Sequence, residues 1–179
     1  TVMVYGNVDE VELVLNGKTI RRQTADKGPD SDYIPVPNGG NGKNLHFPPF
    51  TFYGVPKERG VLEAVGYHQG KKVAEYTVKT PGVPERLDIT YFESGKPATK
   101  NDLLIVYVRM LDKQGVLCPV NGIPVELSVQ GGEIVGPTSY PLEAGVASFL
   151  VRTGEISKIN INATGKGFST RKSLKVGKE

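Results

Sequence analysis

The chain has 179 residues, which is enough for one large or two small domains. Its net charge of +3 is too small to indicate a polyanionic partner, so nucleic-acid binding is not expected. The longest apolar run, residues 103–108, is far shorter than the roughly 20 residues of a spanning helix, so no membrane span is expected. The single cysteine excludes an intrachain disulfide framework and a multi-cysteine zinc site, and two histidines with no tryptophan leave little material for a metal centre or a stacking platform.

The amino-terminal segment already has a strand pattern at residues 1–5, with none of the basic, apolar and cleavage segments of a signal peptide before it. Either a targeting segment has been removed or the chain is a piece of a longer protein, and we expect the piece; its first domain would then lack part of its N-terminal edge.

A first hairpin is predicted around Asn16 and Gly17. Residues 11–15 alternate apolar and polar side chains, which is typical of a strand with one buried and one wet face. Asn16 and Gly17 then supply the two positive-φ positions of a tight hairpin turn.

A second hairpin is predicted with arms at residues 61–65 and 73–78 around a turn at residues 68–71. Between the two hairpins, residues 25–49 are rich in Asp, Gly, Asn and Pro and are predicted to form a long loop. A short strand at residues 50–52 is expected to follow this loop.

The domain boundary is predicted at residues 80–84, where two prolines and a glycine interrupt the strand pattern. The expected domains are residues 1–80 and residues 84–179. No stretch of ten or more residues shows a helical period, so the predicted fold class is all-β, with two immunoglobulin-like β-sandwich domains in tandem. The expected strands of the second domain are residues 86–91, 103–111, 124–129, 145–152, 158–163 and 171–176.

Catalytic residues are not expected in this chain. A glycosidase needs two carboxyl groups about 5–10 Å apart, one of them with a raised pKa. Acidic residues such as Glu10, Glu12 and Glu63 instead occupy the outward positions of alternating strands, as exposed charges do. No Gly-x-Ser-x-Gly elbow accompanies His46 or His68.

A calcium site is the one metal site that the sequence suggests, at Asp26, Asp30 and Asp32. Their spacing misses the calcium-loop pattern and no bidentate Glu closes it, so a solvated acidic loop is the alternative interpretation. Cys118, which precedes Pro119, is predicted to be a small buried hydrophobe rather than a nucleophile. No cofactor is expected.

Carbohydrate contact is the binding role that the aromatic residues suggest, because sugars stack on rings. Tyr33, His46 and Tyr53 lie in or beside the predicted loop and are the candidates. Since the chain has no tryptophan, core packing and loop contacts are the alternative roles for these rings.

Residues 4–18, VYGNVDEVELVLNGK, resemble a segment that follows the catalytic barrel in bacterial family-2 glycoside hydrolases, in particular β-galactosidases. The similarity continues in order through nearly the whole chain. The further similar stretches are residues 60–67, 70–74, 112–119, 132–136 and 145–147.

The resemblance implies a non-catalytic C-terminal accessory region that braces the catalytic TIM barrel of the same polypeptide and helps to shape its cleft. The family's catalytic glutamates lie on that barrel, which needs about 250 residues of its own, so none is carried over to this chain. The fragment is therefore expected to be inactive and its parent to be a β-galactosidase-like hydrolase. The resemblance also implies a bacterial parent exported to the periplasm or outside the cell.

Two other functions stay open at this point. A carbohydrate-binding module would present residues 25–53 to a glycan. An adhesin-type immunoglobulin-like array would bind a protein partner, although the hairpin motifs of the first half favour the hydrolase region.

Overall fold

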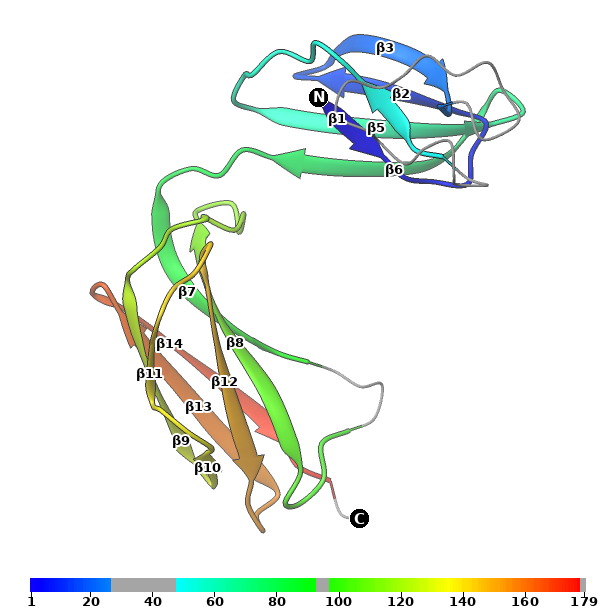
Figure 1. The fold of residues 1–179 in the computed structure, drawn as a ribbon. Coiled ribbons are helices and arrows are strands. Elements are labelled where there is room, and N and C mark those ends of the chain that lie inside the picture. The colour runs from blue at the N-terminus through cyan, green and yellow to red at the C-terminus, as the bar shows by residue number, and fades with distance from the viewer. Residues whose placement is uncertain (27–47, 93–96, 178–179) are drawn as a thin grey trace. The chain divides into compact units, whose positions relative to one another are not determined.

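The computed structural model describes residues 1–26, 48–92 and 97–177 (Figure 1). Regular structure in these residues consists of strands, and every strand pair is antiparallel. The chain divides into two compact units, Thr1–Thr80 and Pro81–Glu179, called here the first and second units. The predicted fold class, all-β with tandem immunoglobulin-like sandwiches, is confirmed. The described residues include no helix of the length and apolarity that crossing a membrane requires.

The first unit pairs a four-stranded sheet with a two-stranded ribbon. The sheet has the strand order β3-β2-β5-β6, and the ribbon consists of β1 and β4. The strands are β1 (Val2–Val4), β2 (Glu10–Leu15), β3 (Lys18–Thr24), β4 (Phe50–Phe52), β5 (Val61–His68) and β6 (Lys71–Lys79).

Both predicted hairpins are present, and their turns use the positive-φ residues that tight turns require. Asn16 and Gly17, with φ of 52° and 77°, connect β2 to β3. Gln69 and Gly70, with φ of 49° and 75°, connect β5 to β6. The Asn16 side chain also accepts a hydrogen bond from the Val61 N–H at 2.8 Å, which ties the first turn to the start of β5.

The core of the first unit lies between the sheet and the ribbon. Val11 and Leu13 of β2 are at most 2% exposed and pack in one cluster with Phe50 and Phe52 of β4. The side chains between them on β2 point to the other face, so the alternation predicted for this strand is confirmed.

The second unit is a sandwich of two four-stranded sheets, ordered β10-β12-β8-β7 and β11-β9-β13-β14 (Figure 1). The six strands predicted for this region are present as β7, β8, β9, β12, β13 and β14. Two short edge strands, β10 and β11, were missed because each has three residues among turn-forming Gly, Pro and Ser. The strands are β7 (Pro84–Tyr91), β8 (Leu103–Asp112), β9 (Pro124–Gln130), β10 (Gly132–Ile134), β11 (Ser139–Pro141), β12 (Val146–Thr153), β13 (Lys158–Gly165) and β14 (Phe168–Lys175).

Among the described residues, the core of the second unit is larger than that of the first. Alternate side chains of the central strands β8 and β13, including Val106, Val108, Ile159 and Ile161, are fully buried. Their neighbours on each strand face outward, which is the two-residue period of a sandwich strand.

A buried carboxylate organises the segment that leads into the second unit. Asp112, at the end of β8, is 4% exposed. Its oxygens accept backbone hydrogen bonds from Gly82 at 2.7 Å and from Gln114 and Val116 at 2.8 Å each. These donors favour the ionised carboxylate and hold the pKa of Asp112 below its usual value. Asp112 therefore holds the predicted domain boundary, residues 80–84, through its hydrogen bond from Gly82.

Candidate functional site on the outer face of the first sheet

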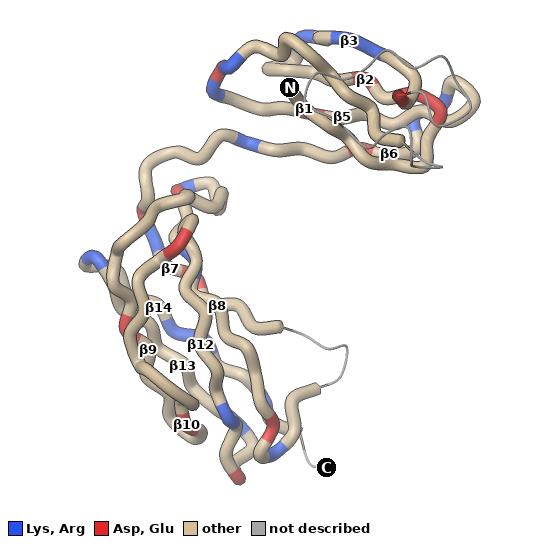
Figure 2. The backbone as a smooth tube through the Cα atoms, in the orientation of Figure 1, with Lys and Arg blue, Asp and Glu red and all other residues tan. Residues whose placement is uncertain are grey.

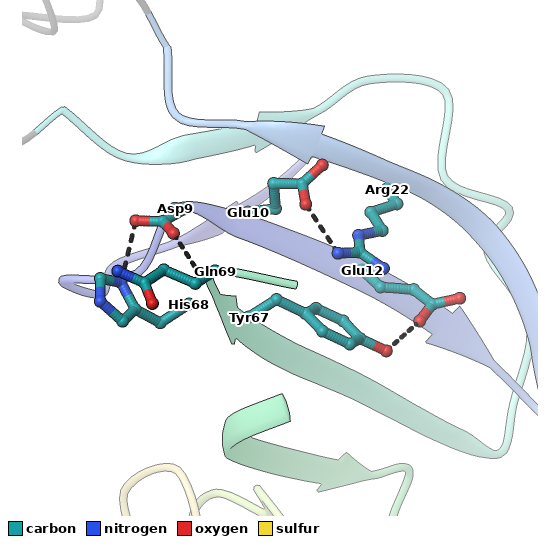
Figure 3. Close-up of polar contacts among 7 residues, drawn as sticks. All are labelled: Asp9, Glu10, Glu12, Arg22, Tyr67, His68 and Gln69. Carbon is teal, nitrogen blue, oxygen red and sulfur yellow. Dashed lines mark hydrogen bonds and ion pairs between the residues drawn. The ribbon is translucent and has the colours of Figure 1, made fainter. Parts of the chain in front are cut away.

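A polar cluster covers the outward face of β2, β3 and β5. Because the intervening residues of β2 are buried, Glu10 and Glu12 both point away from the core. The strand register sets Glu12 opposite Arg22 and Glu10 opposite Tyr67. Three strands thus bring two carboxylates, a guanidinium and a phenol together (Figure 3).

The members of this cluster bond to one another. The Arg22 guanidinium lies 2.6 Å from a Glu10 carboxylate oxygen and 3.7 Å from the centroid of the Tyr67 ring. The Tyr67 hydroxyl donates to Glu12 at 2.8 Å, and the Thr19 hydroxyl donates to the other Glu12 oxygen at 2.7 Å. One face of the Tyr67 ring is therefore occupied by a cation of the same chain.

The electrostatics of this cluster do not suit acid catalysis. The hydroxyls of Thr19 and Tyr67 stabilise the ionised form of Glu12 and lower the pKa of that carboxyl group. The same hydrogen bond to Glu12 raises the pKa of Tyr67. A glycosidase acid needs a carboxyl group with a raised pKa, so Glu12 has the opposite property.

A second polar contact lies at the turn between β5 and β6. The Asp9 carboxylate accepts a hydrogen bond from the Gln69 N–H at 2.7 Å and contacts Nδ1 of His68 at 3.0 Å (Figure 3). The Gln69 amide, followed by His68, lowers the pKa of Asp9. The side chains of Asp9 and His68 are both more than half exposed, so their contact holds the turn at the surface of the protein.

The carbohydrate candidates are placed only in part. Tyr53 follows β4 and is 41% exposed. Tyr33 and His46 lie outside the described residues. Only Tyr53 is among the described residues, so the carbohydrate-contact role of these three residues stays a prediction.

The calcium candidates are also placed only in part. Asp26 directs both carboxylate oxygens to Thr51 of β4, one to its N–H at 3.1 Å and the other to its hydroxyl. Asp30 and Asp32 lie outside the described residues. Within the described ranges, no group of three His, Cys, Asp or Glu residues is arranged to hold a metal ion.

Cys118 is 2% exposed, as expected of a buried small hydrophobe. Burial raises the pKa of its thiol, which favours the neutral and less nucleophilic form. Its sulfur lies 3.7 Å from the Gly82 carbonyl oxygen, within the second unit.

The polar cluster was not predicted from sequence, because its members meet through strand register that the sequence does not show. Glu10 and Glu12 were interpreted as isolated exposed charges. A regular hairpin around Asn16 and Gly17 would set Arg21 opposite Glu12, and the β-bulge between Leu13 and Val14 sets Arg22 there instead, so alternation and the turn alone would have given the wrong cross-strand pair. The addition of Tyr67 depends on the pairing of β2 with β5, which the sequence does not specify.

A family model described as a domain of unknown function (DUF4982) matches residues 1–74. A β-galactosidase of Thermoanaerobacter pseudethanolicus is 29% identical over 164 residues, which are 85% of this chain and 20% of that protein. A solved β-glucuronidase from glycoside hydrolase family 2 has the same fold, with a TM-score of 0.75 at 22% identity over 98% of this chain and 18% of the other.

A β-galactosidase of Rhizobium radiobacter is 30% identical over 112 residues, which are 62% of this chain and 81% of that sequence. The chain belongs to glycoside hydrolase family 2. This family-2 chain spans about a fifth or less of the length of the longer relatives that it matches. The resemblance that the hairpin motifs indicated is thereby confirmed.

Proposed function

We propose that this chain is the non-catalytic C-terminal accessory region of a β-galactosidase-like enzyme, where it braces the catalytic barrel and helps to shape the substrate cleft. The observation that carries the proposal is a difference in coverage. The match to the Thermoanaerobacter β-galactosidase covers 85% of this chain but only 20% of that protein. A TIM barrel of about 250 residues fits in the remaining four-fifths of such a protein and not beside two sandwiches in 179 residues.

The chemistry of the described residues supports the non-catalytic role. Glu12, the best-connected carboxylate of the polar cluster, has a lowered pKa. Acidic and basic positions are scattered along both units, as on solvated sandwich faces (Figure 2). The surroundings of five carboxyl groups lower their pKa, whereas glycoside hydrolysis requires an acid with a raised pKa; these groups are Asp9, Glu12, Glu75, Asp112 and Glu155.

The test compares the full-length enzyme with a truncated form that lacks this region. We expect the truncated form to keep the catalytic carboxylates but to have a half-life at elevated temperature at least tenfold shorter. A lower kcat/KM for an oligosaccharide, with a smaller change for an aryl β-galactoside, would support cleft shaping. Full-length enzyme with Tyr67→Phe is the matched control, because that change leaves every domain present. Equal half-lives and equal kcat/KM values would contradict the proposal.

Carbohydrate contact is the second candidate function, supported by the exposure of Tyr53 beside β4. It predicts saturable binding of a galactoside or oligosaccharide that Tyr53→Ala or Tyr33→Ala weakens. Calorimetric titration against a glycan panel measures this directly. Flat titrations with folded protein would remove the candidate.

A further inference from the structure

An apolar groove of about 390 Å³ opens on the inner side of the first unit, between β1 and the β5-β6 end of the sheet. Val2, Val4 and Tyr5 line one side of it. Leu62, Tyr76 and Val78 line the other. The groove is the part of the sandwich interior that the two-stranded ribbon leaves uncovered.

The strand register shows that the face of β6 that bears Tyr76 and Val78 continues the core-facing side of the first unit's sheet. Leu62 of β5 pairs with Val78, and Ala64 pairs with Tyr76. Paired residues point to the same side of a sheet, so Tyr76 and Val78 share the face on which Leu13 is buried. Nevertheless Tyr76 is 72% exposed and Val78 is 52% exposed.

The opposite face of the same strand has the composition of a solvated surface. Lys72, Glu75, Thr77 and Lys79 are all exposed there, and Lys72 and Glu75 form an ion pair at 2.6 Å. The strand thus has an apolar face and a charged face, and only the apolar face is suited to burial. A contiguous apolar groove on a monomer is typical of an interaction site.

We infer that this groove is the surface on which the catalytic part of the same polypeptide docks, through apolar side chains inserted against Tyr76 and Val78. The inference rests on the proposed function, in which the chain is one part of a longer family-2 enzyme. The longer relatives are at least about five times the length that this chain covers, so a tethered partner is present at high effective concentration. Domain interfaces within one chain commonly bury about 600–1,500 Å², and in such an interface the groove would form the apolar centre.

A second copy of this chain fits the same region less well. Antiparallel pairing of two β6 edges centred on Glu75 would set Glu75 opposite Glu75 and Lys79 opposite Lys71. Like charges directly opposite each other destabilise a strand pair, and edge lysines oppose such association. The charge pattern therefore favours a partner that covers the face of β6 over one that extends its edge.

The test uses thiol labelling in the full-length enzyme. Tyr76→Cys and Val78→Cys place a thiol on the groove face, and Thr77→Cys is the matched control on the opposite face of the same strand. All three positions are exposed in the 179-residue structure. Relative to rates in denaturant, we expect labelling at positions 76 and 78 to be at least tenfold slower than at position 77. Equal rates at the three positions would overturn the inference.

A photoreactive benzophenone side chain in place of Tyr76 identifies the occupant. We expect crosslinks within one molecule that map by mass spectrometry to residues outside these 179, and none from the same group at position 77. Crosslinked dimers, or crosslinks confined to this chain, would overturn the inference.

The outcomes of the labelling test are separable from those of the proposed bracing role. Protection at position 76 with no effect of truncation on enzyme half-life would keep the docking surface and remove the bracing role. A shortened half-life without protection would place the brace elsewhere and overturn the inference.

Discussion

Two aromatic residues of the first unit differ in burial and give a sharp prediction of stability. Phe52 on β4 is 1% exposed and packs against Val11 and Leu13, whereas Tyr76 on β6 is 72% exposed. Burial of about 200 Å² of ring at about 25 cal/mol per Å² contributes about 5 kcal/mol. Phe→Ala substitutions in cores accordingly cost about 3–5 kcal/mol. A unit of this size has a free energy of unfolding of about 4–12 kcal/mol, so Phe52→Ala should remove about a quarter of it or more.

Tyr76→Ala is the matched control, because it removes a ring from the same unit without opening a cavity. In the 179-residue chain it should change the free energy of unfolding by less than about 1 kcal/mol. Urea unfolding followed by pulsed hydrogen exchange and mass spectrometry reports each unit separately. The account of the core is refuted if Phe52→Ala costs less than about 1 kcal/mol, or if Tyr76→Ala costs as much as Phe52→Ala.

Three further predictions concern other contacts. The lowered folded pKa of Asp112 contributes stability that is present above the usual carboxyl pKa of about 4 and is lost as pH falls through the lower folded value. Asp112→Asn should therefore lower the urea midpoint of the second unit at neutral pH and make that midpoint depend less on pH in acid. An unchanged midpoint at every pH would show that the Asp112 carboxylate does not stabilise this unit. Gly145→Ala should lower the free energy of unfolding by more than about 1 kcal/mol, because Gly145 has a φ of +86° and an added Cβ would lie 2.1 Å from a backbone carbonyl oxygen. Gly122 has a φ of +75° but open space around it, so Gly122→Ala should lower the free energy of unfolding by less in the same urea titration. Tyr67→Phe should raise the pKa of Glu12 part of the way to its usual value in an NMR titration, and an unchanged pKa would show that the phenol does not stabilise this carboxylate.

The elements that sequence predicted best are those with local signals. The β2-β3 hairpin follows from alternation and from Asn16 and Gly17, which act within a few residues of one another. The central strands of the second unit follow from apolar runs such as β8. In contrast, β10 and β11 have three residues each and exist because longer strands template them, so no local signal marks them.

The sites were harder to predict because they depend on non-local pairing. Glu12 and Tyr67 are 55 residues apart and meet through the pairing of β2 with β5. The groove depends on how far the β1-β4 ribbon covers the sheet, which alternation in β6 alone does not reveal. The alternation of residues along β6 does place Tyr76 and Val78 on one face, but only the structure shows that these two side chains are exposed.

The central claim, that this region of a family-2 hydrolase is not catalytic, is tested most directly by assaying the purified 179-residue chain with an aryl β-galactoside. The account predicts no turnover by protein that circular dichroism shows to be folded. Turnover that co-purifies with the chain and disappears when the chain is unfolded would contradict the claim.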